Sequence, residues 1–160
     1  ADQKGIDLVV AALPELLTRE VQVAVLGTGS VAYEEAFRRA AAERPDAVAV
    51  RIGFDEALAH RMEAGADLFL MPSRFEPCGL NQMYSLRYGT VPVVRAVGGL
   101  EDTVEDYDGW NRGTGFKFRE YSPRALLVAL RRALETYRDR RAWRSGGESP
   151  QRARLAAIER

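Results

Sequence analysis

Short apolar runs alternate with amphipathic segments along most of the chain, and this alternation is the feature that most limits its possible folds. Between the runs, apolar residues recur at helical spacing, and Ser30, Asp55 and Ser122 are typical helix starts. Alternating strands and helices predict right-handed crossovers and a Rossmann-like, doubly wound parallel α/β sheet. The runs that have the length of buried strands are Val21–Leu26, Val48–Ile52, Leu68–Met71, Val91–Val94 and the shorter Gly115–Phe118.

Composition excludes several classes of protein. Lys plus Arg and Asp plus Glu both number 23, so the net charge is zero, whereas duplex-binding domains usually carry a basic excess. No segment approaches the roughly 20 apolar residues of a membrane span. Cys78 and His60 are the single cysteine and histidine, which excludes a disulfide framework and a Cys/His metal site. We therefore expect no nucleic-acid partner, no membrane segment and no metal.

The chain is long enough for one core, and we expect one domain over residues 1–143. Residues 144–160 are rich in polar and small residues and are predicted to be a linker and tail, with a short helix possible in 151–160. The first predicted element is a helix from Ile6, although a doubly wound sheet normally begins with a strand. The domain is therefore expected to be truncated at its start.

The unusual residues lie where the predicted strands end. Gly27 follows the first strand, Phe54 follows the second, the loop 72–79 follows the third, and Gly99 lies in the loop after the fourth. In an open α/β sheet, ligands bind beyond the carboxyl ends of the strands. These four loops are therefore expected to meet at one crevice.

The pair Gly27 and Gly29 could begin a dinucleotide-binding turn, which would suggest a nicotinamide-dependent oxidoreductase. Ala32 is acceptable at the third position of that motif, but the acidic residue expected about 20 positions later would be Asp46, which precedes a strand instead of ending one. A tight strand-to-helix turn without ligand contact explains the two glycines equally well.

The segment from Pro72 to Gly89 is more informative. Its two prolines present Arg74 and Glu76, and Gly79 then opens a helix whose first N–H groups have no internal partners. Such a helix start is suited to a phosphate group. As alternatives, Glu76 could cap the helix and Arg74 could form a surface ion pair.

Residues 73–82, with the sequence SRFEPCGLNQ, resemble the signature of bacterial glycogen synthases and plant starch synthases. Residues 88–94 (YGTVPVV), 98–104 (GGLEDTV), 3–8 (QKGIDL) and 113–116 (GTGF) extend this resemblance over residues 2–143. The resemblance implies the GT-B architecture of two Rossmann-like domains, of which this chain matches the C-terminal, donor-binding half.

The resemblance also implies roles for individual residues. Lys4 matches the lysine that neutralises the nucleotide diphosphate, and Glu76 matches the catalytic-loop glutamate near the transferred glucose. Tyr84 stands where related enzymes have a second glutamate, so Glu76 would act without that partner. The donor-binding residues that we expect are Gly27, Phe54 (stacked on adenine), Arg74, Cys78, Gly79, Leu80, Asn81 and Gly99.

The activity implied is retaining transfer of glucose from ADP-glucose or UDP-glucose to the non-reducing end of an α-1,4-glucan, with ADP as product and no cofactor. The compartment would be the bacterial cytoplasm, or the plastid in a plant or alga. Because the acceptor would bind to a missing N-terminal domain, the chain alone is expected to be inactive. A noncatalytic nucleotide-binding domain and a GT-B enzyme for another nucleotide sugar remain as alternatives.

Overall fold

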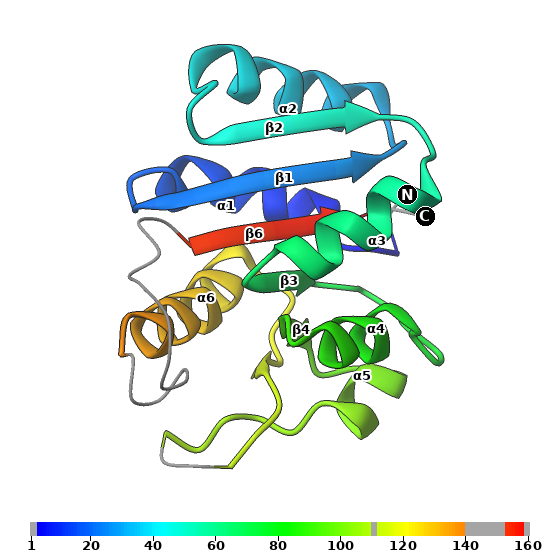
Figure 1. The fold of residues 1–160 in the computed structure, drawn as a ribbon, viewed down its shortest axis with the longest axis vertical. Helices are drawn as coiled ribbons and strands as arrows, with labels where there is room; N and C mark the ends of the chain where they lie inside the picture. The colour runs from blue at the N-terminus through cyan, green and yellow to red at the C-terminus, as the bar shows by residue number, and fades with distance from the viewer. Residues whose placement is uncertain (1–2, 110–111, 140–152, 159–160) are drawn as a thin grey trace.

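The computed structural model describes residues 3–109, 112–139 and 153–158, which form one parallel sheet with helices on both faces (Figure 1). The strand order is β2-β1-β6-β3-β4-β5, and each neighbouring pair is parallel. The predicted α/β class and doubly wound sheet are confirmed. In chain order the elements are α1 (Ile6–Leu16), β1 (Val21–Gly27), α2 (Val31–Glu43), β2 (Val48–Ile52), α3 (Glu56–Gly65), β3 (Leu68–Met71), α4 (Asn81–Tyr88), β4 (Val91–Arg95), α5 (Gly98–Thr103), β5 (Phe116–Phe118), α6 (Pro123–Arg138) and β6 (Ala153–Ile158).

The three predicted helix caps are confirmed. The side chains of Ser30, Asp55 and Ser122 each accept a hydrogen bond from the backbone N–H three residues later. Pro123 occupies the first turn of α6, where a missing N–H costs nothing. These local signals fix where α2, α3 and α6 begin, and therefore how long the loops before them are.

Two apolar clusters cover the two faces of the sheet. The larger one packs α1, α2 and α6 against residues such as Val23, Leu70 and Val93. The smaller one lies under α3 and α5 and includes Phe69 and Leu100, which are fully buried. With helices on both faces, the ends of the strands are the expected place for a ligand.

The C-terminal segment differs from the sequence-based prediction. Residues 153–158 do not form a helix in a polar tail; they form β6, which pairs with β1 over six residues and also with β3. A short run such as Leu-Ala-Ala-Ile suits either a helix or a strand, and the gap between β1 and β3 decides in favour of the strand. The other residues of the predicted linker and tail, 144–152 and 159–160, lie outside the described residues.

The position of β6 is unusual for a last strand. In the common doubly wound order, 3-2-1-4-5-6, the first strand of the domain lies between the second and the fourth. Here that central place belongs to β6, which lies between β1 and β3 (Figure 1). Leu155 and Ala156 of this strand face opposite sides of the sheet. Leu155 belongs to the larger apolar cluster, and Ala156 belongs to the smaller one.

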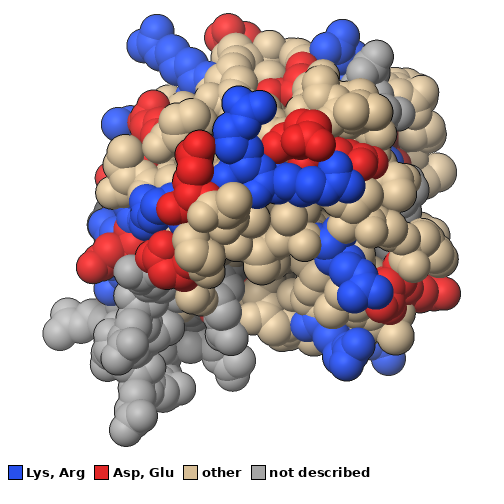
Figure 2. Space-filling view, turned by 90° about the horizontal axis from the view of Figure 1, so that it is seen from above, with Lys and Arg blue, Asp and Glu red and all other residues tan. Residues whose placement is uncertain are grey.

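Charged side chains of both signs are mixed on the surface. Figure 2 shows basic and acidic side chains next to one another on one face, without a large area of a single sign. On α2, Arg38 lies 3.3 Å from Glu34 and 3.6 Å from Glu35. Among the helices that the structure describes, none combines the length and the apolar character needed to cross a lipid bilayer.

Replacing Leu155 by alanine tests the place of β6 in the sheet. Leu155 is 1% exposed, so Leu155→Ala is expected to lower the free energy of unfolding by about 2–5 kcal/mol. Urea denaturation measures this change, with Val128→Ala on the exposed side of α6 as the control. A change below about 0.5 kcal/mol, typical of surface positions, would contradict a buried central strand.

Candidate functional site

The carboxyl ends of the parallel strands lie at one edge of the sheet, as the direction of the arrows in Figure 1 shows. Gly27 is the last residue of β1, Phe54 lies two residues beyond β2, and Arg95 ends β4. The loop 72–80 leaves β3 at the same edge and leads to α4. All four loops therefore leave the sheet at this edge, and they touch in pairs: Gly53 donates to the Gly27 carbonyl, and Gly99 donates to the Glu76 carbonyl, each at 3.0 Å. We refer to the region around the loop 72–80 and the first turn of α5 as the crevice that the sequence predicts.

The turn before α1 is held against the loop after β3. The carbonyl of Gln3 accepts a hydrogen bond from the N–H of Arg74 at 2.7 Å. Gly5 has φ +71° and lies so close to Pro72 that a Cβ on it would be 2.0 Å from the Pro72 carbonyl oxygen. Only glycine fits both the left-handed conformation and this approach. This contact brings Lys4 to the crevice from a distant part of the sequence.

Lys4 and Glu76 form an ion pair in the crevice. Their Nζ and Oε2 atoms are 2.6 Å apart, and the side chains are 34% and 9% exposed. Ser73 is also buried, and its hydroxyl donates to the same Oε2 at 3.5 Å. Because a buried charge needs a partner, Lys4 compensates the Glu76 carboxylate.

Two glycines at the start of α5 allow the loop 72–80 to lie directly against this helix. The N–H of Gly99 donates to the Glu76 carbonyl at 3.0 Å. A Cβ on Gly98 would lie 2.1 Å from that carbonyl oxygen, and a Cβ on Gly99 would lie 2.0 Å from the Cys78 carbonyl oxygen. The backbone of Glu76 is therefore fixed from both sides, which limits where its carboxylate can point.

Charged contacts anchor the other end of α5. Glu101 lies 3.1 Å from the Arg119 guanidinium and 3.4 Å from the Lys117 ammonium, both at or beside β5. Burial raises the pKa of Glu101, but hydrogen bonds and the charges of Arg119 and Lys117 outweigh burial and lower the pKa below its usual value. The carboxylate form is thus favoured, and it ties α5 to the sheet.

The start of α4 leaves backbone donors open. Leu80 is the N-cap residue and makes no side-chain cap. Within the described part of the chain, the N–H groups of Gly79 and Leu80 donate to no acceptor. Asn81 begins the helix, and Cys78 is exposed. Free N–H groups at a helix start attract anions, since the helix dipole adds to their partial charge.

The turn after β1 is different, although it has the glycine pair of a dinucleotide motif. The N–H of Gly29 donates to the Glu34 side chain of α2 at 3.2 Å. A carboxylate of the helix itself therefore already accepts from this N–H group. Asp46 precedes β2 and pairs with Arg44 at 3.3 Å, at the opposite edge of the sheet from Gly27. The geometry therefore favours the structural interpretation of this turn over a dinucleotide site.

Two predicted donor-binding residues, Phe54 and Arg74, lie in the loops that follow β2 and β3. Phe54 is 76% exposed, which leaves its ring free to stack. The Arg74 guanidinium lies 4.4 Å from the ring centre of Tyr121 and 3.6 Å from Asp7. Burial and the hydrogen bond to Asp7 raise the pKa of Tyr121, while Arg74 opposes this effect. Arg74 thus forms the ion pair that the sequence left as an alternative role.

Sequence reasoning missed three residues that shape the site. Ser73 contacts Glu76, and Arg95 donates to the carbonyls of Ser73 and Arg74 at 3.4 and 2.9 Å. Gln82 is completely buried and binds the carbonyls of Cys78 and Gly79. Ser73 and Gln82 belong to the quoted motif, but nothing in a motif tells which of its polar side chains are buried.

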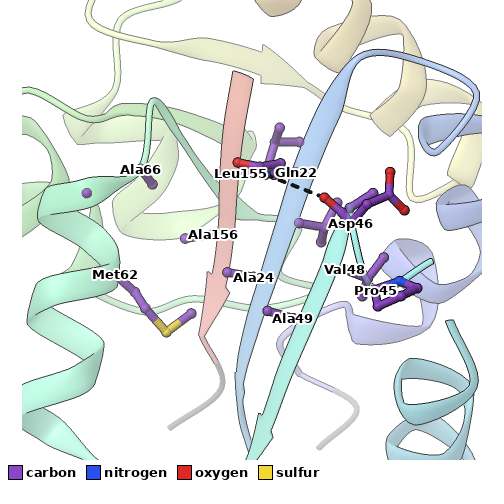
Figure 3. Close-up of a pocket in the computed structure, with 13 residues that line it drawn as sticks. Gln22, Ala24, Pro45, Asp46, Val48, Ala49, Met62, Ala66, Leu155 and Ala156 are labelled. Carbon is purple, nitrogen blue, oxygen red and sulfur yellow. Dashed lines mark hydrogen bonds between the residues drawn. The ribbon is translucent and has the colours of Figure 1, made fainter. Parts of the chain in front are cut away.

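Other parts of the described chain offer weaker candidates for a functional site. No group of three or more His, Cys, Asp and Glu residues in the described ranges could hold a metal ion. An apolar hollow of about 330 Å³ lies between α3 and strands β1, β2 and β6, with Met62 and Ala156 among its lining residues (Figure 3). Its lining includes Gln22 and Asp46, which lie at the amino ends of β1 and β2. The side-chain amide of Gln22 donates a hydrogen bond to the Asp46 carbonyl. The hollow is therefore separate from the crevice.

Comparison with known proteins places the chain in a family. The family model for "Glycosyl transferases group 1" matches residues 1–149. Glycogen synthase of Anaeromyxobacter sp. (strain Fw109-5) is 79% identical over 145 residues, which are 91% of this chain and 30% of that protein. Glycogen synthase of Aromatoleum aromaticum is 64% identical over 148 residues, with coverage of 90% and 30%. The chain thus spans 30% of the length of these curated relatives.

Two solved structures share the fold. The catalytic domain of starch synthase IV from Arabidopsis thaliana, bound to ADP and acarbose, has a TM-score of 0.77 and 35% identity, covering 89% of this chain and 31% of that one. Sucrose-phosphate synthase from Thermosynechococcus elongatus has a TM-score of 0.66 and 25% identity, with coverage of 84% and 34%. Both similarities extend over most of the chain.

Replacing Gly99 by alanine tests the close contact between α5 and the loop. The new Cβ would meet the Cys78 carbonyl at 2.0 Å, and forced repacking of this kind costs about 1–3 kcal/mol of stability. Gly65→Ala is the control, because a Cβ there has nothing within 4 Å. Chemical denaturation is expected to separate the two variants. Equal stabilities would mean that the loop does not rest on α5.

Proposed function

Because the chain belongs to the group 1 glycosyl transferases and has the fold of a GT-B domain, we propose that it is the donor-binding domain of a glycogen synthase. In the whole enzyme it would help to transfer glucose from ADP-glucose to the non-reducing end of an α-1,4-glucan. The observation that carries this proposal is the Lys4–Glu76 pair beside the open N–H groups at the start of α4. The names of the bacterial relatives support the same activity, and we propose the bacterial cytoplasm as its compartment.

The donor diphosphate would lie between Lys4 and the start of α4. The Lys4 ammonium and the N–H groups of Gly79 and Leu80 come from two segments that meet at the crevice. Together they would stabilise the negative charge that grows on the diphosphate as it leaves, which is the role of an oxyanion hole. The protein's own donors would thus supply the positive charge, and we expect no metal in the step.

Glu76 would act on the sugar side of the same bond. It is paired with a cation, unlike the two neighbouring carboxylates of retaining glycosidases. We therefore expect departure and attack on one face of the sugar. The bond between the anomeric carbon and the diphosphate oxygen breaks, and its electron pair stays on the phosphate. The acceptor hydroxyl bonds to the anomeric carbon and gives its proton to that oxygen.

The base and the acceptor would be recognised outside this charged centre. The exposed ring of Phe54, beyond β2, offers a flat face on which adenine could stack. Stacking of this kind would also accept uracil, so UDP-glucose is the alternative donor. The glucan would bind to the other domain of the whole enzyme, so the chain alone would bind the donor without extending a glucan.

ADP is expected to stabilise the folded chain. A ligand at 100 times its dissociation constant adds about 2.7 kcal/mol, which a thermal-shift titration detects as a higher Tm. UDP is expected to act more weakly, and NADH is not expected to act at all. If millimolar ADP leaves the Tm of the folded chain unchanged while NADH raises it, the donor site proposed here is wrong.

Glu76→Gln in the full-length enzyme is expected to reduce kcat by about 10²- to 10³-fold, because it removes a charge aimed at the reacting centre. The dissociation constant for ADP should change much less. Glu20→Gln is the matched control, since Glu20 is exposed and directly precedes β1, at the opposite ends of the strands. Transfer of labelled glucose to glycogen measures kcat. Near-normal turnover of Glu76→Gln would show that this carboxylate is structural.

A further inference from the structure

The amide of Gln82 lies inside the protein, directly beneath the loop that leads to α4. Gln82 is completely buried, which is unusual for a polar side chain in the first turn of a helix. Its Nε2 donates to the carbonyls of Cys78 and Gly79 at 3.1 and 2.7 Å, and to the hydroxyl of Thr103 at 3.1 Å. Its Oε1 accepts no hydrogen bond from any described residue.

These contacts determine which way two peptide groups face. In a trans peptide, the carbonyl of one residue and the N–H of the next point in opposite directions, and the described chain has no cis peptide. Because the Cys78 carbonyl turns inward to Gln82, the N–H of Gly79 turns outward. The Gly79 carbonyl likewise turns the N–H of Leu80 outward. Neither of these two N–H groups has an acceptor among the described residues.

Gly79 makes this arrangement possible. Its φ of +61° is in the left-handed region, and a Cβ on it would lie 2.5 Å from Oε1 of Gln82. The glutamine side chain thus fills the space that a side chain at position 79 would need. The loop and Gln82 are fitted to each other.

The same amide also joins the loop to α5. Thr103 accepts from Gln82 and donates to the Gly99 carbonyl at 2.5 Å. The N–H of Gly99 in turn holds the Glu76 carbonyl. A continuous set of hydrogen bonds therefore runs from the start of α4 through Thr103 and Gly99 to the backbone of Glu76.

We infer that Gln82 is a positioning residue for the donor diphosphate, because it aims the N–H groups of Gly79 and Leu80 at the phosphate oxygens. This inference rests on the proposed function. Gln82 itself does not touch the donor; it acts through the orientation of two peptide groups. Thr103 supports it from α5, so that the phosphate-binding groups and Glu76 keep a fixed relation to each other.

The first test replaces Gln82 by methionine, which keeps the size of the side chain and removes its N–H donors. The chain with Gln82→Met is expected to bind ADP about tenfold more weakly, as the loss of an aligned charged hydrogen bond implies. Adenosine has the same base and ribose but no phosphate, so its binding should not change. Calorimetry with ADP and NMR titration with adenosine measure the two constants.

A matched control uses another buried polar residue of α4. Ser85 is also completely buried, and its hydroxyl has no partner among the described residues. Ser85→Ala should bind ADP as the parent chain does. In the full-length enzyme, Gln82→Met should lower kcat more than it raises KM for the donor, because the N–H groups bind the leaving diphosphate most strongly in the transition state.

If Gln82→Met does not fold, a second pair of variants, at Thr103, provides the test. Thr103→Val removes the hydroxyl with little change in shape and should weaken ADP binding by about threefold. Thr103→Ser keeps the hydroxyl and should bind as the parent does. Equal ADP affinities for these two variants would overturn the inference.

The outcomes distinguish this inference from the proposed function. If the parent chain binds ADP and a folded Gln82→Met binds it equally well, Gln82 has no positioning role. Equal weakening of ADP and adenosine would also overturn the inference, since it would indicate a general loss of structure. If the parent chain does not bind ADP, the proposed function fails, and the inference fails with it.

Discussion

The backbone of the loop 72–80 lies in direct contact with the first turn of α5, and the candidate site depends on this contact. No side chain fits between them, because a Cβ on Gly98 or Gly99 would come within 2.1 Å of a carbonyl oxygen. The hydrogen bond from Gly99 to the Glu76 carbonyl then fixes the loop relative to β4 and α5. Glu76 is held by packed backbone on a rigid scaffold, which is what a catalytic group requires.

A buried carboxylate in this position has an electrostatic cost, and its compensation comes from far away in the sequence. Lys4 is 72 positions from Glu76, yet the docking of Gln3 and Gly5 on the loop brings its ammonium to 2.6 Å. Removal of either partner would leave a partly buried charge uncompensated. The pairing therefore joins the first turn of the chain to the loop between β3 and α4.

The sequence was sufficient for the elements whose signals are local. Caps at Ser30, Asp55 and Ser122, together with short β-branched runs, predicted the helices and the first strands correctly. The strand β6 was not predicted: its residues were assigned to a polar tail with a possible short helix, because only the non-local pairing with β1 and β3 selects the extended form. The gathering of loops at one edge followed from the parallel sheet. The inward direction of the Ser73 and Gln82 side chains could not be predicted from the sequence, since burial arises from packing between distant segments.

Two strand-to-helix turns at the same edge of the sheet show why a glycine motif alone is weak evidence for a phosphate site. The turn after β1 has the more familiar pattern, but Glu34 already accepts the N–H of Gly29, so an incoming phosphate would meet a carboxylate there. The turn before α4 has no side-chain cap, and Gln82 holds its carbonyls inward while its N–H groups remain open. An anion site needs donors that the helix itself does not satisfy. Whether this condition is met depends on Glu34, five residues after Gly29, and on Gln82, three residues after Gly79. The difference between them supports our proposal that the phosphate binds at the start of α4.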